Sequence, residues 1–196
     1  MKKFRPRPAV VIFSAWLIVL ALSSFSCSQY DYSSPSPGII EVHLKTISTK
    51  IDFSPLNNFV LKVSSVTAIR SNGTEVLVFE DIQAKDRLTS VYNTLDIRAR
   101  DSSLVIGQGY APPGDYIGIN LSVIPGDQII LNGYQQVDVV PPANFNPLLQ
   151  FRKPFTVTES AGTRINLTVN LDSTLIKSSQ SFFFRPTYYI SSISLF

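Results

Sequence analysis

The sequence has few of the side chains that carry metal and nucleophile chemistry: one cysteine, one histidine and one tryptophan in 196 residues. A single cysteine excludes a disulfide framework and zinc sites built from several cysteines. The single histidine, His43, excludes metal sites built from several histidines, and a Ser–His–Asp triad would have to use it. We therefore expect no metal and no other cofactor.

Charged residues are also few, at 16% of the chain. Four of the basic residues precede the first apolar run, and without them 13 basic and 14 acidic residues remain. The sequence pI of about 9.0 is thus a property of the N-terminal segment. This balance argues against a nucleic-acid partner. The four residues are Lys2, Lys3, Arg5 and Arg7.

The sequence lacks the motifs of common enzyme classes. It contains no Gly-x-Ser-x-Gly, no phosphate-binding loop and no His-Glu-x-x-His. His43 alternates with Glu41 and Lys45 on the polar side of an expected strand, which predicts a solvated histidine. The carboxylates are scattered, and no spacing suggests the pair that a glycosidase needs. We therefore expect a protein that is not an enzyme.

Two further groups of aspartates have simple explanations. Asp115 and Asp127 each follow Pro-Gly, where a turn accounts for them without a ligand. Asp81 and Asp86 leave a loop calcium site open, but their segment lacks the dense Asp/Asn/Gly pattern of such loops. The same segment, 81–91, is the best candidate for a short helical turn.

Residues 1–26 are typical of an export signal. A basic segment precedes a continuous apolar stretch, Ala9–Leu22, which only Ser14 interrupts. As a helix this stretch spans about 21 Å, which is short of the roughly 30 Å hydrocarbon core of a membrane. Its length therefore favours a cleaved signal over a permanent span.

The one cysteine, Cys27, stands directly after this signal. Bacterial lipoprotein signals end in small residues before a cysteine that is then acylated, and Ser26 fits that pattern. Phe25 and Ser24 depart from the usual residues, so ordinary secretion and an uncleaved anchor remain alternatives. We predict a lipidated Cys27, whose acyl chains anchor the protein in a membrane.

Residues 27–37 form the expected tether between this anchor and the domain. The segment is rich in serine and proline and has no hydrophobic periodicity. Its ten residues after Cys27 reach up to about 35 Å. Ser28 stands where an aspartate often signals retention in the inner membrane, which favours the outer membrane of a bacterial cell envelope.

From Gly38 to Phe196 the dominant hydrophobic period is two, as in strands with one buried face. Turn signals such as Asn72-Gly73, Asn132-Gly133 and Pro125-Gly126-Asp127 separate the runs, and 141–153 is expected to be an irregular connection. We predict an all-β fold, an antiparallel β-sandwich of eight to ten strands over 38–196. The expected strands are 40–44, 59–69, 75–79, 103–106, 117–123, 128–131, 135–139, 155–158, 165–171 and 181–193.

The densest aromatic cluster, Phe182 to Phe184, lies in the last expected strand. Neighbouring side chains of a strand face opposite ways, so the three rings cannot all enter one core. We expect at least one of them to lie under a loop or in solvent. An exposed ring on a sandwich can stack on a sugar or pack against a protein partner.

Short motifs along 38–191 resemble a domain-of-unknown-function family found in exported lipoproteins of the Bacteroidetes and related bacteria. The resemblance implies an immunoglobulin- or transthyretin-like sandwich and no known activity, so it transfers no functional residues. Members similar to this chain often have Thr-Asp after the first strand, where Lys45-Thr46-Ile47 stands here. The motifs are Gly38-Ile39-Ile40-Glu41-Val42, Val63-Ser64-Ser65-Val66, Pro113-Gly114-Asp115-Tyr116, Ile119-Asn120-Leu121, Leu131-Asn132-Gly133, Phe155-Thr156-Val157, Asn166–Asp172 and Arg185-Pro186.

These features predict a lipid-anchored envelope protein that binds or supports a partner without catalysis. A surface polysaccharide and another envelope protein are both candidate partners. An adhesin or pilus-like subunit that exchanges strands is one alternative, with 181–196 as the segment to be donated. An envelope polysaccharide hydrolase is the other.

Overall fold

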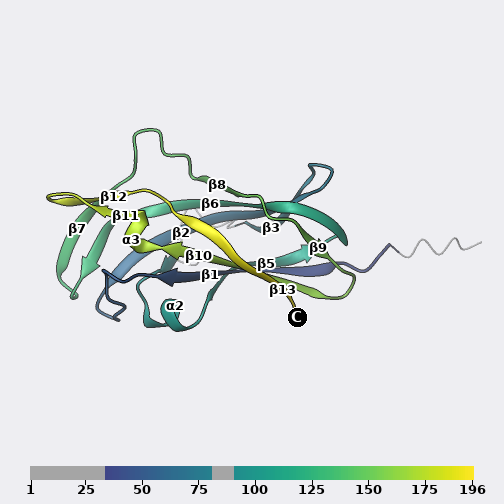
Figure 1. Ribbon diagram of the computed structural model, residues 1–196, viewed down its shortest axis with the longest axis horizontal. Helices are drawn as coiled ribbons and strands as arrows, with labels where there is room; N and C mark the ends of the chain where they lie inside the picture. The colour runs from purple at the N-terminus through teal and green to yellow at the C-terminus, as the bar shows by residue number, and fades with distance from the viewer. Residues whose placement is uncertain (1–33, 81–90) are drawn as a thin grey trace, which may run out of the picture. The chain divides into compact units, whose positions relative to one another are not determined.

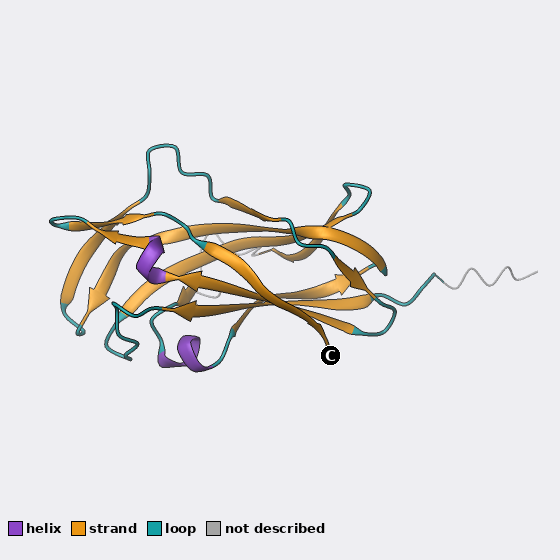
Figure 2. Ribbon diagram, in the orientation of Figure 1, coloured by secondary structure: helices purple, strands orange, loops and turns teal. Residues whose placement is uncertain are grey.

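The computed structural model, which describes residues 34–80 and 91–196, contains two facing sheets. Along many of their strands the side chains alternate between buried and more exposed positions. All of the described residues but Ser34 belong to one unit, Pro35–Phe196. The all-β sandwich expected from the sequence is confirmed, with the strands and two short helices arranged as Figures 1 and 2 show. The elements are β1 (Gly38–Ile47), β2 (Asn58–Arg70), β3 (Glu75–Glu80), β4 (Val91–Asn93), α2 (Ile97–Asp101), β5 (Leu104–Ala111), β6 (Gly114–Leu131), β7 (Gln135–Val140), β8 (Leu148–Phe151), β9 (Phe155–Val157), β10 (Gly162–Asn170), α3 (Leu171–Thr174), β11 (Leu175–Lys177), β12 (Ser181–Phe184) and β13 (Tyr188–Leu195).

One sheet has four strands in the order β13-β10-β1-β5. The other has nine, with β11-β12-β7-β6-β2-β3 as its main path, β4 beside β2, and β8 and β9 beside β6. The sheets are mixed rather than purely antiparallel, because β1 pairs with β10 and β7 pairs with β12 in parallel. The parallel pair β1–β10 places two chain segments far apart in sequence side by side, with their C-terminal ends together.

The core lies between the inward faces of the two sheets. Val42, Ile165 and Leu167 contribute from the four-stranded sheet, and Phe59 and Leu121 from the other, each at most 1% exposed. Burial of such side chains, at roughly 25 cal/mol per Å² of apolar surface, is the main force that holds the sheets together.

Tyr116 ties the connection before β6 to the core. Its hydroxyl donates to the carbonyl of Pro112 at 2.7 Å, and its ring stacks on Phe155 with centroids 5.1 Å apart. This bond from a buried tyrosine to the backbone four residues upstream resembles the tyrosine corner found in Greek-key sandwiches. Burial raises the pKa of the hydroxyl above its ordinary value.

Two of the expected hairpins are confirmed. Asn72-Gly73 joins β2 to β3, and Asn132-Gly133 joins β6 to β7. Asn132 has φ 55° and Gly133 has φ 78°, the pair of positive values that a type I′ turn requires. Asparagine and glycine adopt these angles at little cost, which is why this dipeptide is a reliable hairpin signal.

Three sequence predictions about the strands are wrong. Pro125-Gly126-Asp127 is not a turn but a bulge inside β6, since Phe59 pairs with Ile129 and Leu61 already pairs with Pro125. The connection at 141–153 contains strand β8, whose Leu149 packs against the core. The run 181–193 is two strands in different sheets, β12 and β13, separated at Pro186.

Helix α2 was not expected, because five residues are too short to show a helical period. Its local signal is Asp96, which caps the first turn by accepting from the backbone N–H of Arg98 at 2.9 Å. The helical turn expected at 81–91 falls almost entirely on 81–90, outside the described residues, and Val91 opens β4.

Candidate functional site

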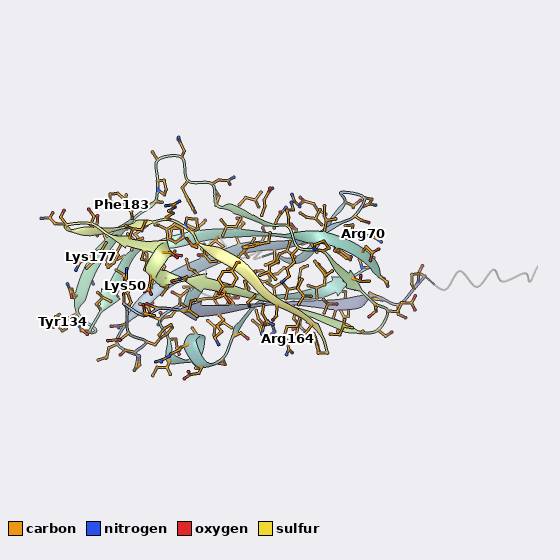
Figure 3. The ribbon with its side chains drawn as sticks, viewed as in Figure 1. Lys50, Arg70, Tyr134, Arg164, Lys177 and Phe183 are labelled. Atoms are coloured by element: carbon orange, nitrogen blue, oxygen red, sulfur yellow. The ribbon has the colours of Figure 1, made fainter. Side chains whose placement is uncertain are left out.

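A groove of about 500 Å³ lies at the end of the sandwich where β1 finishes at Ile47, here called the distal end. Its walls come from the loop after β1, the β6–β7 hairpin, α3 and the edge strand β11. Figure 3 shows two of its lining residues, Lys50 and Lys177, at the same end of the domain as Tyr134 and Phe183. The distal groove is lined by Lys50, Ile51, Asp52, Asn57, Leu131, Asn132, Asp172, Leu175, Ile176, Lys177 and Phe182.

The distal end is opposite to the end at which the chain enters the domain. Strand β1 begins at Gly38 and runs for ten residues, about 33 Å, before the groove loop starts. Figures 1 and 3 show β1 starting at the right of the domain, at the same end as Arg70, and the labelled groove residues at the left. The groove is thus separated by the length of the sandwich from residues 35–38, where the expected tether ends and the domain begins.

Asp172 fixes the loop that forms one wall of the groove. Its Oδ1 accepts from the Ser48 hydroxyl at 2.7 Å and from the Lys50 backbone N–H at 3.1 Å. Its Oδ2 accepts from the Thr49 backbone N–H at 2.8 Å and from the Thr49 hydroxyl at 2.7 Å. The carboxylate is therefore fully engaged within the protein and holds the loop after β1 against α3.

These bonds also set the charge of Asp172. Burial alone would raise the pKa of this carboxyl, but the hydrogen bonds from Ser48, Thr49 and Lys50 outweigh it and lower the pKa to about 2. Asp172 thus stays ionised at neutral pH. A general acid needs a raised pKa, so Asp172 is unsuited to that role.

Asn57 is the second residue whose side chain holds the walls of the groove together by internal hydrogen bonds. Its side-chain Oδ1 accepts from the backbone N–H of Asn132 at 2.7 Å, and its Nδ2 donates to the carbonyl of Asp52 at 2.8 Å. The residue is only 5% exposed. It joins the tip of the β6–β7 hairpin to the loop before β2 and so fixes the width of the groove.

Four other polar side chains in the groove make no such hydrogen bonds with the described parts of the protein. The ammonium groups of Lys50 and Lys177 form no ion pair with any acidic side chain in the described ranges 34–80 and 91–196. Within the same ranges, the Asp52 carboxylate and the Asn132 side-chain amide have no hydrogen-bond partner. The groove therefore offers two cations, one anion and one amide to a ligand, above apolar groups such as Leu175.

A row of exposed apolar side chains adjoins the groove at strand β11. Ile176 pairs with Phe183 of β12, and Phe183 pairs with Val140 of β7, so the three lie side by side across three strands. Phe183 is 49% exposed, whereas Phe182 and Phe184 are 7% and 1% exposed. The expectation that one ring of this cluster faces solvent is confirmed, and Ile176 belongs to both the groove and the row.

Comparison of the chain with family models, with curated proteins and with solved structures finds no match to any of them. The candidate site therefore rests on its own geometry.

His43 forms a second polar cluster, on β1 of the four-stranded sheet. The expectation of a solvated histidine is wrong, because the residue is 8% exposed and both ring nitrogens have partners. Nδ1 lies 2.9 Å from the Ser103 hydroxyl, and Nε2 lies 3.1 Å from Oε2 of Glu41. Arg164 also donates to Glu41 at 3.2 Å. The hydrogen bond from His43 is the largest of the effects that lower the pKa of Glu41.

The order Ser103, His43, Glu41 is that of a nucleophile, a base and an acid. Because ionised Glu41 can only accept, Nε2 of His43 carries the proton and Nδ1 accepts from Ser103 while the ring is neutral. In serine hydrolases the nitrogens are used the other way round. Neither the distal groove nor the two smaller hollows, at β8–β13 and at the β6 bulge, is lined by Ser103.

The structure places the remaining sequence candidates as follows. Cys27 and the pair Asp81 and Asp86 lie outside the described residues. Asp115, expected in a turn, is the second residue of β6 and accepts from the Thr156 hydroxyl at 2.8 Å. Asp127 lies in the β6 bulge and is exposed.

Among residues 34–80 and 91–196, no group of three or more His, Cys, Asp or Glu side chains is arranged to hold a metal ion. Within the same part of the chain, no helix has the length and hydropathy needed to cross a membrane.

Sequence reasoning missed the groove residues as a set. Lys50 and Lys177 lie in segments without a motif, and Asp172 was one of many scattered carboxylates. The parallel pairing of β1 with β10 brings the residues after both strands together, and no pattern in the sequence predicted that pairing.

Proposed function

We propose that the protein is a lipid-anchored, non-catalytic binding module of the bacterial cell envelope, and that its distal groove is the binding surface. The observation that carries the proposal is the position of the groove, at the end of the sandwich opposite to residues 35–38. A ligand site held away from the tether is accessible to partners beyond the membrane surface. Binding sites commonly use loops at one end of a rigid sandwich in this way.

Two features of the sequence support the lipid anchor. The one cysteine of the chain directly follows an apolar segment of signal length, and small residues precede it. The ten residues after Cys27 lack hydrophobic periodicity, as a tether does. A lipid attached at Cys27 would hold the domain within about 35 Å of a membrane.

The proposal is tested by comparing the native protein with a Cys27→Ser variant in cells. We expect the native chain in the outer-membrane fraction with fatty acid on its N-terminal cysteine, and the variant released from the membrane. Protease added to intact cells then separates a surface location from a periplasmic one. A Cys27→Ser chain that stays membrane-bound with its leader uncleaved would contradict the anchor.

Strand exchange is less well supported than a module that is complete in one chain. β13, part of the segment expected to be donated, pairs with β10 of its own chain from Thr163 to Val169. Its Ile190 and Ile193 pack against the core. We therefore expect deletion of 190–196 to abolish folding, as monitored by circular dichroism. A folded monomer that no longer assembles would favour the adhesin or pilus-like alternative.

A hydrolase is the second candidate, and two observations favour testing it. Asp52 and Asp172 line one groove, and Ser103, His43 and Glu41 are hydrogen bonded in series. Reaction of Ser103 with a fluorophosphonate probe, lost in Ser103→Ala, would support a serine hydrolase. Cleavage of an envelope polymer, lost in Asp52→Asn, would support a glycosidase. We expect neither reaction.

A further inference from the structure

We propose that the distal groove binds an acidic polysaccharide, whose anionic groups contact Lys50 and Lys177 and whose next sugar ring stacks on Phe183. This inference rests on the proposed function of the groove as the binding surface. It adds the chemical class of the ligand and the role of each side chain.

The first step is the division of the groove's polar groups into used and unused ones. Asp172 and Asn57 are engaged by internal hydrogen bonds that fix the walls. Asp52, Asn132 and the two lysines have no such partners in the described residues. A set of unpaired donors and acceptors in one hollow suits a ligand with many hydroxyl groups, since each hydroxyl both donates and accepts.

The second step concerns charge. Lys50 and Lys177 carry ammonium groups without an ion pair among the described residues, and of the two carboxylates in the lining only Asp52 is not already held by internal hydrogen bonds, since four donors hold Asp172. Asp172 keeps its charge, so the four charges of the lining balance, and it is the two ammonium groups without an ion pair that favour a ligand with carboxylate, sulfate or phosphate groups. Lysine binds such groups as a point charge and does not require one geometry, which suits a flexible polymer.

The third step is the path from the groove to the exposed aromatic ring. Ile176 lines the groove, and it is the cross-strand neighbour of Phe183 on the outer face of the sheet. Because β11 is the edge strand, a chain lying in the groove can pass over it onto the ring of Phe183. The negative face of an aromatic ring attracts the C–H bonds of a sugar, which carry partial positive charge.

The size of the surface also indicates a polymer. A volume of about 500 Å³ falls within the range of sites for small organic ligands, and the row at Ile176, Phe183 and Val140 extends the surface beyond it. A single sugar would leave the row uncovered, whereas a chain of several sugars covers both parts.

The test uses the full-length lipoprotein in detergent and three soluble polymers. Polygalacturonate carries one carboxylate on each sugar, its carboxyl-reduced form has the same rings without charge, and poly-glutamate has carboxylates without sugars. We expect binding to polygalacturonate alone, measured by isothermal calorimetry. Raising NaCl from about 0.05 M to about 0.5 M should weaken it, since salt screens exposed charges.

Matched variants locate the site. The pair Lys50→Gln and Lys177→Gln should weaken binding about tenfold, while Lys45→Gln with Lys153→Gln, the same charge change elsewhere, should leave it unchanged. Phe183→Ala should weaken binding several-fold, and Tyr110→Ala, which removes a ring that is 72% exposed on another strand, should not.

Several results would overturn the inference. Equal binding of the charged and reduced polymers removes the role of the lysines, and equal binding of poly-glutamate removes the role of the sugar. Binding that survives both the lysine and the Phe183 changes places the ligand elsewhere. If none of the three polymers binds, the ligand class is rejected, while the Cys27→Ser experiment still decides separately whether the protein is a lipid-anchored envelope protein.

Discussion

Single residues hold the groove in shape, and Asp172 is the most important of them. Replacing it with asparagine keeps the size of the side chain but removes an acceptor oxygen, which leaves donors of the 48–50 loop unpaired. We expect Asp172→Asn to lower the free energy of unfolding at pH 7 by about 1–3 kcal/mol, measured by urea denaturation. Asp127→Asn, at an exposed position in β6, is the control and should change it little.

The same carboxylate makes stability depend on acid. Its pKa of about 2 in the folded protein lies below the ordinary value of 3.8, so the stabilisation is fully present above about pH 4 and is lost as the pH falls toward 2. The Asp172→Asn variant should therefore lose less stability than the native protein between about pH 5 and pH 2. An equal loss of stability in the native protein and in the variant over this pH range would show that the ionised Asp172 carboxylate does not stabilise the fold.

Tyr116 allows a test of the tyrosine corner. Tyr116→Phe keeps the buried ring but removes the hydroxyl that donates to the carbonyl of Pro112. The loss of this bond should cost about 1–2 kcal/mol of unfolding free energy in thermal or chemical denaturation. Tyr110→Phe, which removes an exposed hydroxyl, should cost almost nothing, and an equal cost for both changes would argue against the corner.

At the scale of elements, β13 is fastened to β10 at the proximal end, where β1 starts at Gly38. The ring of Phe196 lies directly on Gly162, where a Cβ atom would come within 2.3 Å of it, and the Arg164 guanidinium stands 4.7 Å from the ring centroid. Backbone hydrogen bonds join Phe196 and Gly162 in both directions. This contact holds the end of an edge strand in its own sheet.

A double-mutant cycle tests that contact. Gly162→Ala should displace the Phe196 ring and cost about 1 kcal/mol of unfolding free energy through lost packing and the lost cation–π contact. In a Phe196→Ala background the same change should cost much less, because no ring remains to be displaced. Additive costs would show that the ring does not depend on Gly162.

The elements also show what the sequence could predict. Strands with strict alternation, such as β1 and β10, and the hairpins at Gly73 and Gly133 follow from local chemistry alone. Strand β6 was divided in the prediction because Pro125-Gly126 resembles a turn, whereas pairing with β2 on both sides keeps the strand continuous around a bulge. Local signals cannot show such long-range pairing.

The candidate site was beyond prediction for the same reason. The contact between Thr49 and Asp172 joins residues 123 positions apart, and it exists because β1 and β10 run in parallel. The exposed aromatic ring was anticipated from the alternation in 182–184, but its place beside the groove required the register of β11 with β12.

At the scale of the whole molecule, the described domain has two ends with different roles. The proximal end receives the chain at Gly38 and fastens β13 through Phe196. The distal end carries the groove and the exposed row at Phe183. With a lipid at Cys27, this polarity would turn the groove toward partners and away from the anchor.

The most direct test of a distal binding surface is photo-crosslinking in living cells. A benzophenone amino acid is placed at Phe183, at Tyr134, which is 80% exposed at the distal hairpin, or at Tyr110 as a control on β5. The proposed function predicts adducts with an envelope component at Phe183 and Tyr134 and none at Tyr110. Adducts of equal yield at all three positions, or at Tyr110 alone, would contradict it.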